Sequence, residues 1–137
     1  MKYYPSGDVY IVILEPGDEV MESLKKFAEE TDFYGFFIGI GAVKDLKIGY
    51  FDLRKKEYII KEMEGEFEVT SLIGNISRDE NGEIIVHAHI TLGGRDYTLI
   101  GGHLISAVVS VTLEIFCIIT RRITRRFDEK TGLKLIS

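Results

Sequence analysis

The chain has 137 residues, of which 45% are hydrophobic and 28% charged, a composition typical of a folded protein with one core over residues 1–137. Its formal net charge of −5 argues against a protein that binds nucleic acid mainly through phosphate contacts, because such proteins usually carry a basic excess. No stretch reaches the roughly 18 uncharged apolar residues of a membrane span, and the opening MKYYPSGD lacks the pattern of a signal peptide, so we expect a cytoplasmic protein.

The predicted elements begin with VYIVIL, residues 9–14, whose β-branched apolar residues indicate a buried strand. Residues 17–32 contain an apolar stripe with helical spacing, and Asp18 is the expected N-cap. The rest of the chain is rich in β-branched and aromatic residues punctuated by Gly, Asn and Asp. It predicts strands at 35–44, 46–53, 57–63, 66–76, 83–92, 96–101 and 108–119.

One main helix flanking about seven strands, without alternation of strand and helix, predicts an α+β fold with a largely antiparallel sheet. The segment VVSVTLEIFCII, residues 108–119, is nearly continuously apolar, which is typical of a strand covered on both faces. One helix cannot cover both faces of a sheet, so we expect subunits to pack sheet against sheet. The alternative is a monomer with a strongly coiled sheet.

All three histidines of the chain lie in HAHITLGGRDYTLIGGH, residues 87–103. His87 and His89 are two apart on a predicted strand and therefore point to the same face. A three-residue hairpin loop would place His103 opposite His87 on that face, because opposed residues of a hairpin share a face. A four-residue loop would point His103 to the opposite face, unless a bulge at Gly101–Gly102 adds one residue and returns it to the face of His87 and His89.

Three neutral imidazoles suit a divalent metal ion, most readily Zn²⁺ and also Ni²⁺ or Cu²⁺. Three protein ligands leave a fourth position for water or for a small-molecule ligand, as in reactive zinc sites. The alternative is that His87, His89 and His103 are polar side chains on a half-exposed face.

A reaction at such a site would also need a general acid or base. Glu68 and Glu114 are the candidates, because each interrupts an otherwise apolar strand; the alternative for both is an ion pair. The only cysteine, Cys117, excludes an internal disulfide, and its apolar surroundings predict a buried side chain rather than a nucleophile. RRITRR, at 121–126, opens a basic C-terminal extension, residues 121–137, interpreted as a solvated strand end or tail, with a phosphate-binding patch as the alternative.

The blocks GIGAVKDLKIGYFD, GEFEVTSLIGNIS, HAHITLG and GGHL, in this order, resemble the plants-and-prokaryotes conserved (PPC) domain over roughly residues 3–120. The resemblance implies a sheet of about seven strands flanked by a helix and assembled as a homotrimer. It also implies that His87, His89 and His103 hold a metal, usually taken as zinc. Plant members of the family tend to lack these histidines and to carry AT-hooks; this chain has the histidines and no AT-hook, which argues against binding DNA.

Three functions follow from these patterns. The first is a small trimeric metalloprotein that binds a ligand at the metal or performs hydrolytic or lyase-like chemistry there. The second is a DNA-associated regulatory protein that uses RRITRR as its contact. The third is a metal with a purely structural role.

The chain has no Gln and has Asn only at positions 75 and 81, a composition that resembles that of proteins from hot environments. This composition concerns the origin of the protein rather than its activity.

Overall fold

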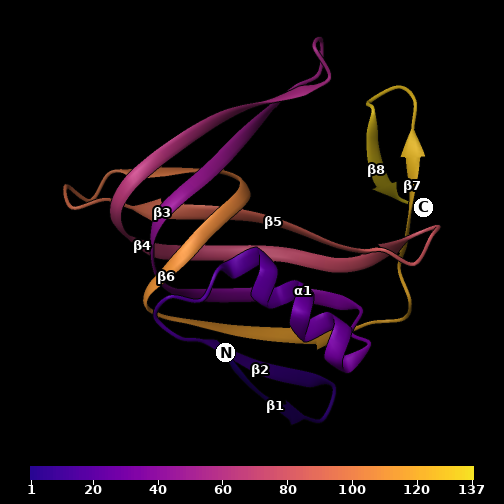
Figure 1. Ribbon diagram of the computed structural model, residues 1–137, viewed down its shortest axis with the longest axis horizontal. Helices are drawn as coiled ribbons and strands as arrows, with labels where there is room; N and C mark the ends of the chain where they lie inside the picture. The colour runs from indigo at the N-terminus through magenta and orange to yellow at the C-terminus, as the bar shows by residue number, and fades with distance from the viewer.

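The computed structural model describes residues 1–137 and contains one helix and eight strands in a single sheet (Figure 1). The bounds are β1 Lys2–Ser6, β2 Val9–Leu14, α1 Val20–Thr31, β3 Gly35–Asp52, β4 Glu57–Asp79, β5 Ile84–Gly93, β6 Leu99–Ile119, β7 Thr124–Asp128 and β8 Leu133–Ile136. The strand order is β1-β2-β6-β3-β4-β7-β8, and β5 pairs with β4 and β6. Every pair is antiparallel except β4 with β7, so the predicted α+β class with a largely antiparallel sheet is confirmed.

Three of these strands are longer than the sequence pattern indicates, because predicted neighbours join without a turn. The segments 35–44 and 46–53 form β3, and a register shift between Lys44 and Leu46 marks the junction, where Asp45 has a φ of 48°. The segments 57–63 and 66–76 form β4 in the same way, and 96–101 and 108–119 join in β6. Such irregularities bend a strand and increase its twist, and the long strands curl so that β6 pairs along its length with β2, β3 and β5.

Helix α1 covers one face of the curled sheet (Figure 1). Its apolar stripe, with Leu24 and Phe27 fully buried, packs into the main core together with side chains of β2, β3 and β6. Cys117 belongs to this core, which confirms the predicted burial, and that burial raises the pKa of its thiol to about 12.

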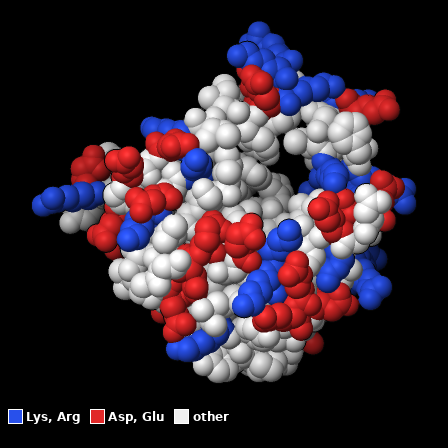
Figure 2. Space-filling view, in the orientation of Figure 1, with Lys and Arg blue, Asp and Glu red and all other residues white.

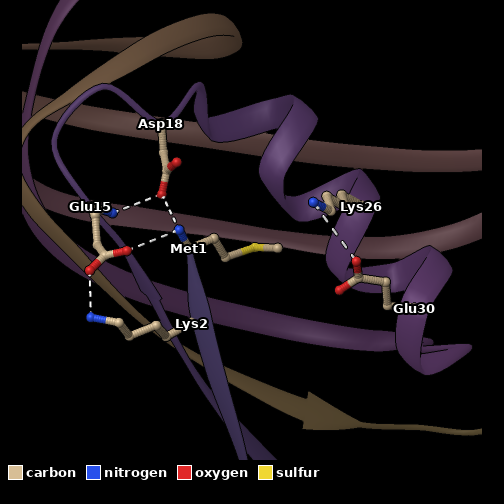
Figure 3. A network of polar contacts seen from close by, with 6 residues as sticks. All are labelled: Met1, Lys2, Glu15, Asp18, Lys26 and Glu30. Carbon is tan, nitrogen blue, oxygen red and sulfur yellow. Dashed lines mark hydrogen bonds and ion pairs between the residues drawn. The ribbon is translucent and has the colours of Figure 1, made fainter.

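The helix begins one residue later than the sequence suggests. The N-cap is Glu19, whose Oε2 accepts from the backbone N of Glu22 at 2.7 Å, and not Asp18. The Oδ2 of Asp18 instead accepts from the backbone N of Glu15 at 2.9 Å and pairs with the Met1 amine at 2.8 Å (Figure 3). Asp18 therefore binds the chain's first residue, just before β1, to the loop that precedes the helix, and the neighbouring Glu19 caps the helix.

The sheet face opposite to α1 carries a row of seven directly paired residues, which crosses six strands and meets β6 twice. Tyr4 pairs with Ile11, Ile11 with Phe116, Phe116 with Ile38, and Ile38 with Ile73. The row then continues from Ile73 to His89 and from His89 to His103. Because paired residues share a face, the histidines lie on the same side of the sheet as a series of exposed apolar side chains.

The C-terminal extension is not a solvated tail, which corrects that part of the sequence analysis. Residues 124–136 form the hairpin β7–β8, and β7 adds to the edge of β4 through Arg78–Thr124 and Asp79–Arg125. The Nζ of Lys134 bonds the Oδ2 of the buried Asp79 at 2.7 Å and fixes the hairpin to β4. The only helix has twelve residues, too few to cross a membrane.

Candidate metal centre

The β5–β6 hairpin brings the three histidines to one face by a register that the sequence did not predict. His89, and not His87, lies opposite His103, and the loop consists of five residues, 94–98. The loop closes through the backbone N of Gly94, which donates to the O of Thr98 at 3.1 Å, and through Tyr97, which has a φ of 65°. A loop of five residues, like one of three, is odd in length and therefore places His103 on the same face as His87 and His89. The prediction that all three imidazoles share a face is confirmed.

The imidazoles form a compact cluster. One ring nitrogen of each histidine lies within 4.8 Å of the corresponding nitrogens of the other two. The ring centroids are 5.3 Å apart for His87 and His89, 5.2 Å for His87 and His103, and 5.5 Å for His89 and His103. His87 and His103 are half-buried and His89 is exposed, so the cluster is supported by protein on one side and open on another.

His103 is held from the side by an aromatic ring. The ring of Tyr58, on β4, stacks on the imidazole with centroids 4.6 Å apart. Gly49 on β3 pairs with His103 and leaves the space for this ring, since a Cβ at Gly49 would lie 2.8 Å from the Cδ1 of Tyr58. Burial, followed by the neighbouring His87 and His89, lowers the pKa of His103 from 6.5 to about 4, so the ring is neutral at neutral pH.

His87 has a basic neighbour. The Nη2 of Arg125, on β7, lies 3.3 Å from the Nδ1 of His87. Burial lowers the pKa of His87, and the Arg125 charge and then His89 lower it further. A guanidinium has only donors, so the Nδ1 of His87 presents its lone pair to Arg125.

The residues of the cluster fit a divalent metal ion. The Nδ1 of His103 is buried without a hydrogen-bond partner, which is costly unless another group takes its lone pair or its proton. Neutral imidazoles are the form that binds metals, and both half-buried rings are held in that form. His87, His89 and His103 would hold the ion, which when bound would offer a Lewis-acidic position to a ligand.

Glu68 and Glu114 lie elsewhere on the outward sheet face. Both are exposed and line one shallow pocket together with Ile40 and Thr112. Neither lines the two cavities that the histidines border. A role for either carboxylate as acid or base at the metal therefore stays a hypothesis.

The sequence analysis missed Arg125 as a residue of the site. This residue is 5% exposed and its side chain reaches inward from RRITRR, whereas Arg122 pairs with Asp32 at 3.5 Å and Arg126 with Glu80 at 3.5 Å. The sequence feature that indicates the hairpin carrying Arg125 is the turn-forming DEKTG, residues 128–132, which lies between two short β-rich segments. The motif is therefore divided between one buried arginine and three exposed ones.

The fold and the cluster define a small, mainly β protein with three histidines gathered on one hairpin. A family model described as the Plants and Prokaryotes Conserved (PCC) domain matches residues 1–120. The chain belongs to this family, which confirms the resemblance. A comparison with curated proteins gave no match.

Solved structures extend the similarity to nearly the whole chain. A PPC protein from Pyrococcus horikoshii is 34% identical, with a TM-score of 0.87 over 96% of this chain and 92% of that one. A metal-containing protein from Archaeoglobus fulgidus is 34% identical, with a TM-score of 0.86 over 98% of this chain and 96% of that one. A protein from Bacteroides thetaiotaomicron named a "putative dna binding protein" is 32% identical, with a TM-score of 0.94 over 99% of this chain and 96% of that one.

Proposed function

We propose that the protein is a metalloprotein in which His87, His89 and His103 bind one divalent ion per chain, most readily Zn²⁺, and present it to a small-molecule ligand. The observation that carries the proposal is the approach of three ring nitrogens within 4.8 Å. The metal-containing relative from Archaeoglobus fulgidus supports it. Ni²⁺ and Cu²⁺ suit the same donor set, so the identity of the ion is to be measured.

The test is elemental analysis of the purified protein, followed by titration of the chelated protein with Zn²⁺, Ni²⁺ and Cu²⁺. The chain has no histidine outside the cluster, so every imidazole signal in a histidine-selective NMR spectrum reports on the site. We expect one equivalent of Zn²⁺ to shift the signals of all three rings. Retention of unshifted imidazole signals at saturating metal would overturn the proposal.

The proposed assembly is a homotrimer whose subunits cover the outward sheet face. The exposed apolar side chains on this face form one contiguous patch instead of being scattered singly over the surface. Contiguous apolar patches of this kind mark interaction sites. The exposed fractions are 40% for Phe36, 44% for Ile38, 60% for Ile40, 43% for Ile73, 49% for Phe116 and 41% for Ile118. The two-sided apolar pattern of residues 108–119 has the same origin, since one side of β6 faces the α1 core and the other this face.

DNA binding is the alternative, and the charge distribution speaks against it. On the face that Figure 2 shows, acidic and basic side chains are interspersed, and one group of basic side chains lies at the tip of the β3–β4 arm, which is formed by the end of β3, the start of β4 and the turn 53–56 between them. Of the four arginines in RRITRR, one is buried and two have acidic partners. The test is a titration with duplex DNA at low salt, repeated at higher salt. Binding that weakens steeply as the salt concentration rises would favour this alternative, and absence of binding at low salt would exclude it.

A purely structural metal is the remaining alternative. In that case the metal would raise the melting temperature, and no small molecule would change the spectrum of a cobalt-substituted protein. A ligand at the open coordination position would change that spectrum. The spectrum of one cobalt-substituted sample therefore distinguishes a purely structural metal from a metal that binds a ligand.

A further inference from the structure

The strongest feature outside the histidine cluster is Arg125, a buried cation without an acidic partner. Only 5% of the residue is exposed, and no carboxylate lies within ion-pair distance of it. Its hydrogen-bond acceptors are all neutral. Nε donates to the Ser77 Oγ at 2.8 Å, Nη1 to the Lys134 O at 2.9 Å, and Nη2 to the Asn75 Oδ1 at 2.8 Å and toward the His87 Nδ1 at 3.3 Å.

A guanidinium keeps its charge in proteins, so its burial carries a desolvation cost that a paired anion normally offsets. Burial lowers the pKa of Arg125, which reflects this cost. Ser77, Asn75 and the Lys134 carbonyl fix the direction of the guanidinium and supply no negative charge. The arrangement holds a positive charge beside the histidines at a fixed position.

Arg125 borders a cavity of about 350 Å³ between β5, β6 and the β7–β8 hairpin. Figure 2 shows a hollow between the β3–β4 arm and this hairpin. The polar lining consists of Tyr58, His87, His103, Arg125 and Lys134, and no acidic residue takes part. The remainder is apolar: Ile85, Val86, Leu133 and Leu135. The cavity thus combines positive charge and histidine nitrogens with an apolar wall.

The hydrogen bond between Arg125 and His87 cannot persist when His87 is a metal ligand. If His87 binds the ion through Nδ1, the lone pair that Arg125 now uses is taken. If it binds through Nε2, Nδ1 carries the ring proton and faces a donor of Arg125. In both cases one N–H of a buried guanidinium loses its acceptor, beside a coordination position that three protein ligands leave open.

We propose that Arg125 binds the carboxylate of a small, mainly apolar carboxylic acid, whose other oxygen occupies the open position at the metal. This inference rests on the proposed metal site. A carboxylate supplies the missing negative charge and accepts from a guanidinium strongly, and the apolar wall from β5 and β8 favours a short hydrocarbon body over a phosphate ester. The proposal gives the C-terminal hairpin, which lies beyond the matched residues 1–120, a role in ligand binding.

The experiment is calorimetric titration of the zinc-loaded full chain with butyrate, benzoate, inorganic phosphate and butyramide. Wild type is expected to bind butyrate or benzoate and to bind phosphate and butyramide at least about tenfold more weakly, because phosphate is a poor match to the apolar wall and the amide lacks the charge. Stronger binding of phosphate than of either carboxylate overturns the carboxylate assignment. Absence of binding by both carboxylates overturns the proposal outright.

Arg125→Gln and Arg126→Gln form a matched pair, since Arg126 is the exposed neighbour that pairs with Glu80. Arg125→Gln should lose carboxylate affinity at least about tenfold and keep one metal ion per chain, and Arg126→Gln should behave as wild type. Equal carboxylate affinity in all three proteins refutes the role of Arg125. A wild-type chain that binds no metal overturns the proposed function itself, so the two failures are distinguishable.

If Arg125→Gln does not fold, the wild-type protein still provides a test. The cobalt-substituted protein should change its visible spectrum on addition of butyrate, and the side-chain NMR signal of the buried arginine should shift in the same titration. A spectral change without a shift of this arginine signal would place the carboxylate at the metal alone and refute the proposal.

Discussion

His89 on β5 lies directly opposite His103 on β6, and this cross-strand pairing brings the two rings to the same face of the sheet. His87 joins them because it is two residues from His89 on the same face. The pair also ends the row of residues that begins at Tyr4 and crosses the exposed apolar face. The candidate metal centre and the proposed subunit interface are therefore adjacent parts of one surface.

Replacing His89 by Asn should abolish most metal affinity without changing the stability of the metal-free protein. His89 is exposed, so its substitution should alter the free energy of unfolding in chelator by no more than about 0.5 kcal/mol. Changes in residues that only hydrogen-bond the ligands lower metal affinity roughly 10–100-fold, so removal of a ligand itself should lower it further. Zinc titration and urea unfolding measure the two quantities.

Tyr97→Asn is the control for this substitution. Tyr97 is 92% exposed in the same hairpin, and Asn tolerates its positive φ. This variant should bind zinc as wild type does. Equal zinc affinity of His89→Asn and wild type would contradict the three-histidine site.

Gly49→Ala should weaken the site by displacing Tyr58 from His103. The new Cβ would lie 2.8 Å from the Tyr58 ring and 3.2 Å from the Cδ1 of Ile105. Overpacking of this kind costs about 1–3 kcal/mol, so the free energy of unfolding should fall by that amount, and the NMR signal of His103 should shift. Gly93→Ala is the matched control, because its Cβ would meet nothing closer than 3.6 Å. A Gly49→Ala protein as stable as Gly93→Ala would show that the stacked ring is not confined.

The sequence predicts the shared face of the histidines and not their register, for a physical reason. Side chains of a strand alternate with period two, so any odd-numbered hairpin loop without a bulge places His87, His89 and His103 on one side. The loop length depends on Tyr97 adopting a positive φ, which is unusual for a residue other than Gly, Asn or Asp and gives no signal in the sequence.

Arg125 could not be placed from the sequence because its role depends on a long-range parallel pairing of β7 with β4. The alternation in ITRRF directs Arg125 inward and Arg126 outward, but without the pairing partner the two are equivalent solvated cations. The fused strands β3, β4 and β6 were divided in the prediction because Gly, Asp and Ser at bends resemble turn residues. Their continuity is a property of tertiary pairing.

Ile38→Asp should dissociate the proposed homotrimer. Ile38 is 44% exposed in the subunit and pairs with Phe116 and Ile73 at the middle of the apolar row, so a charge there would be buried without a partner on assembly. Sedimentation should show a trimer for wild type and a monomer for the variant. Leu53→Asp is the control, because Leu53 is 60% exposed in the turn after β3, outside the row. A monomeric wild type, or a trimeric Ile38→Asp protein, would refute the interface.

The metal-free protein should lose stability as the pH falls from 6.5 to about 4, in part because of His103. Its pKa is about 4 in the folded chain and near 6.5 in the unfolded chain, so between these values the unfolded state binds more protons on this ring. The free energy of unfolding therefore falls with decreasing pH in this window, and the contribution of His103 levels off below it. His87 acts in the same direction, since its pKa is also lowered.

His103→Gln isolates this contribution, because carboxylates titrate in both proteins and cancel in the difference. Urea unfolding in chelator, at one protein concentration, should show wild type losing stability relative to the variant as the pH falls through the window. A difference that stays constant from pH 6.5 to about 4 would mean that the ring is as free to take up a proton in the folded chain as in the unfolded one. The imidazole would then not be held neutral by burial, and the physical basis for its readiness as a metal ligand would be lost.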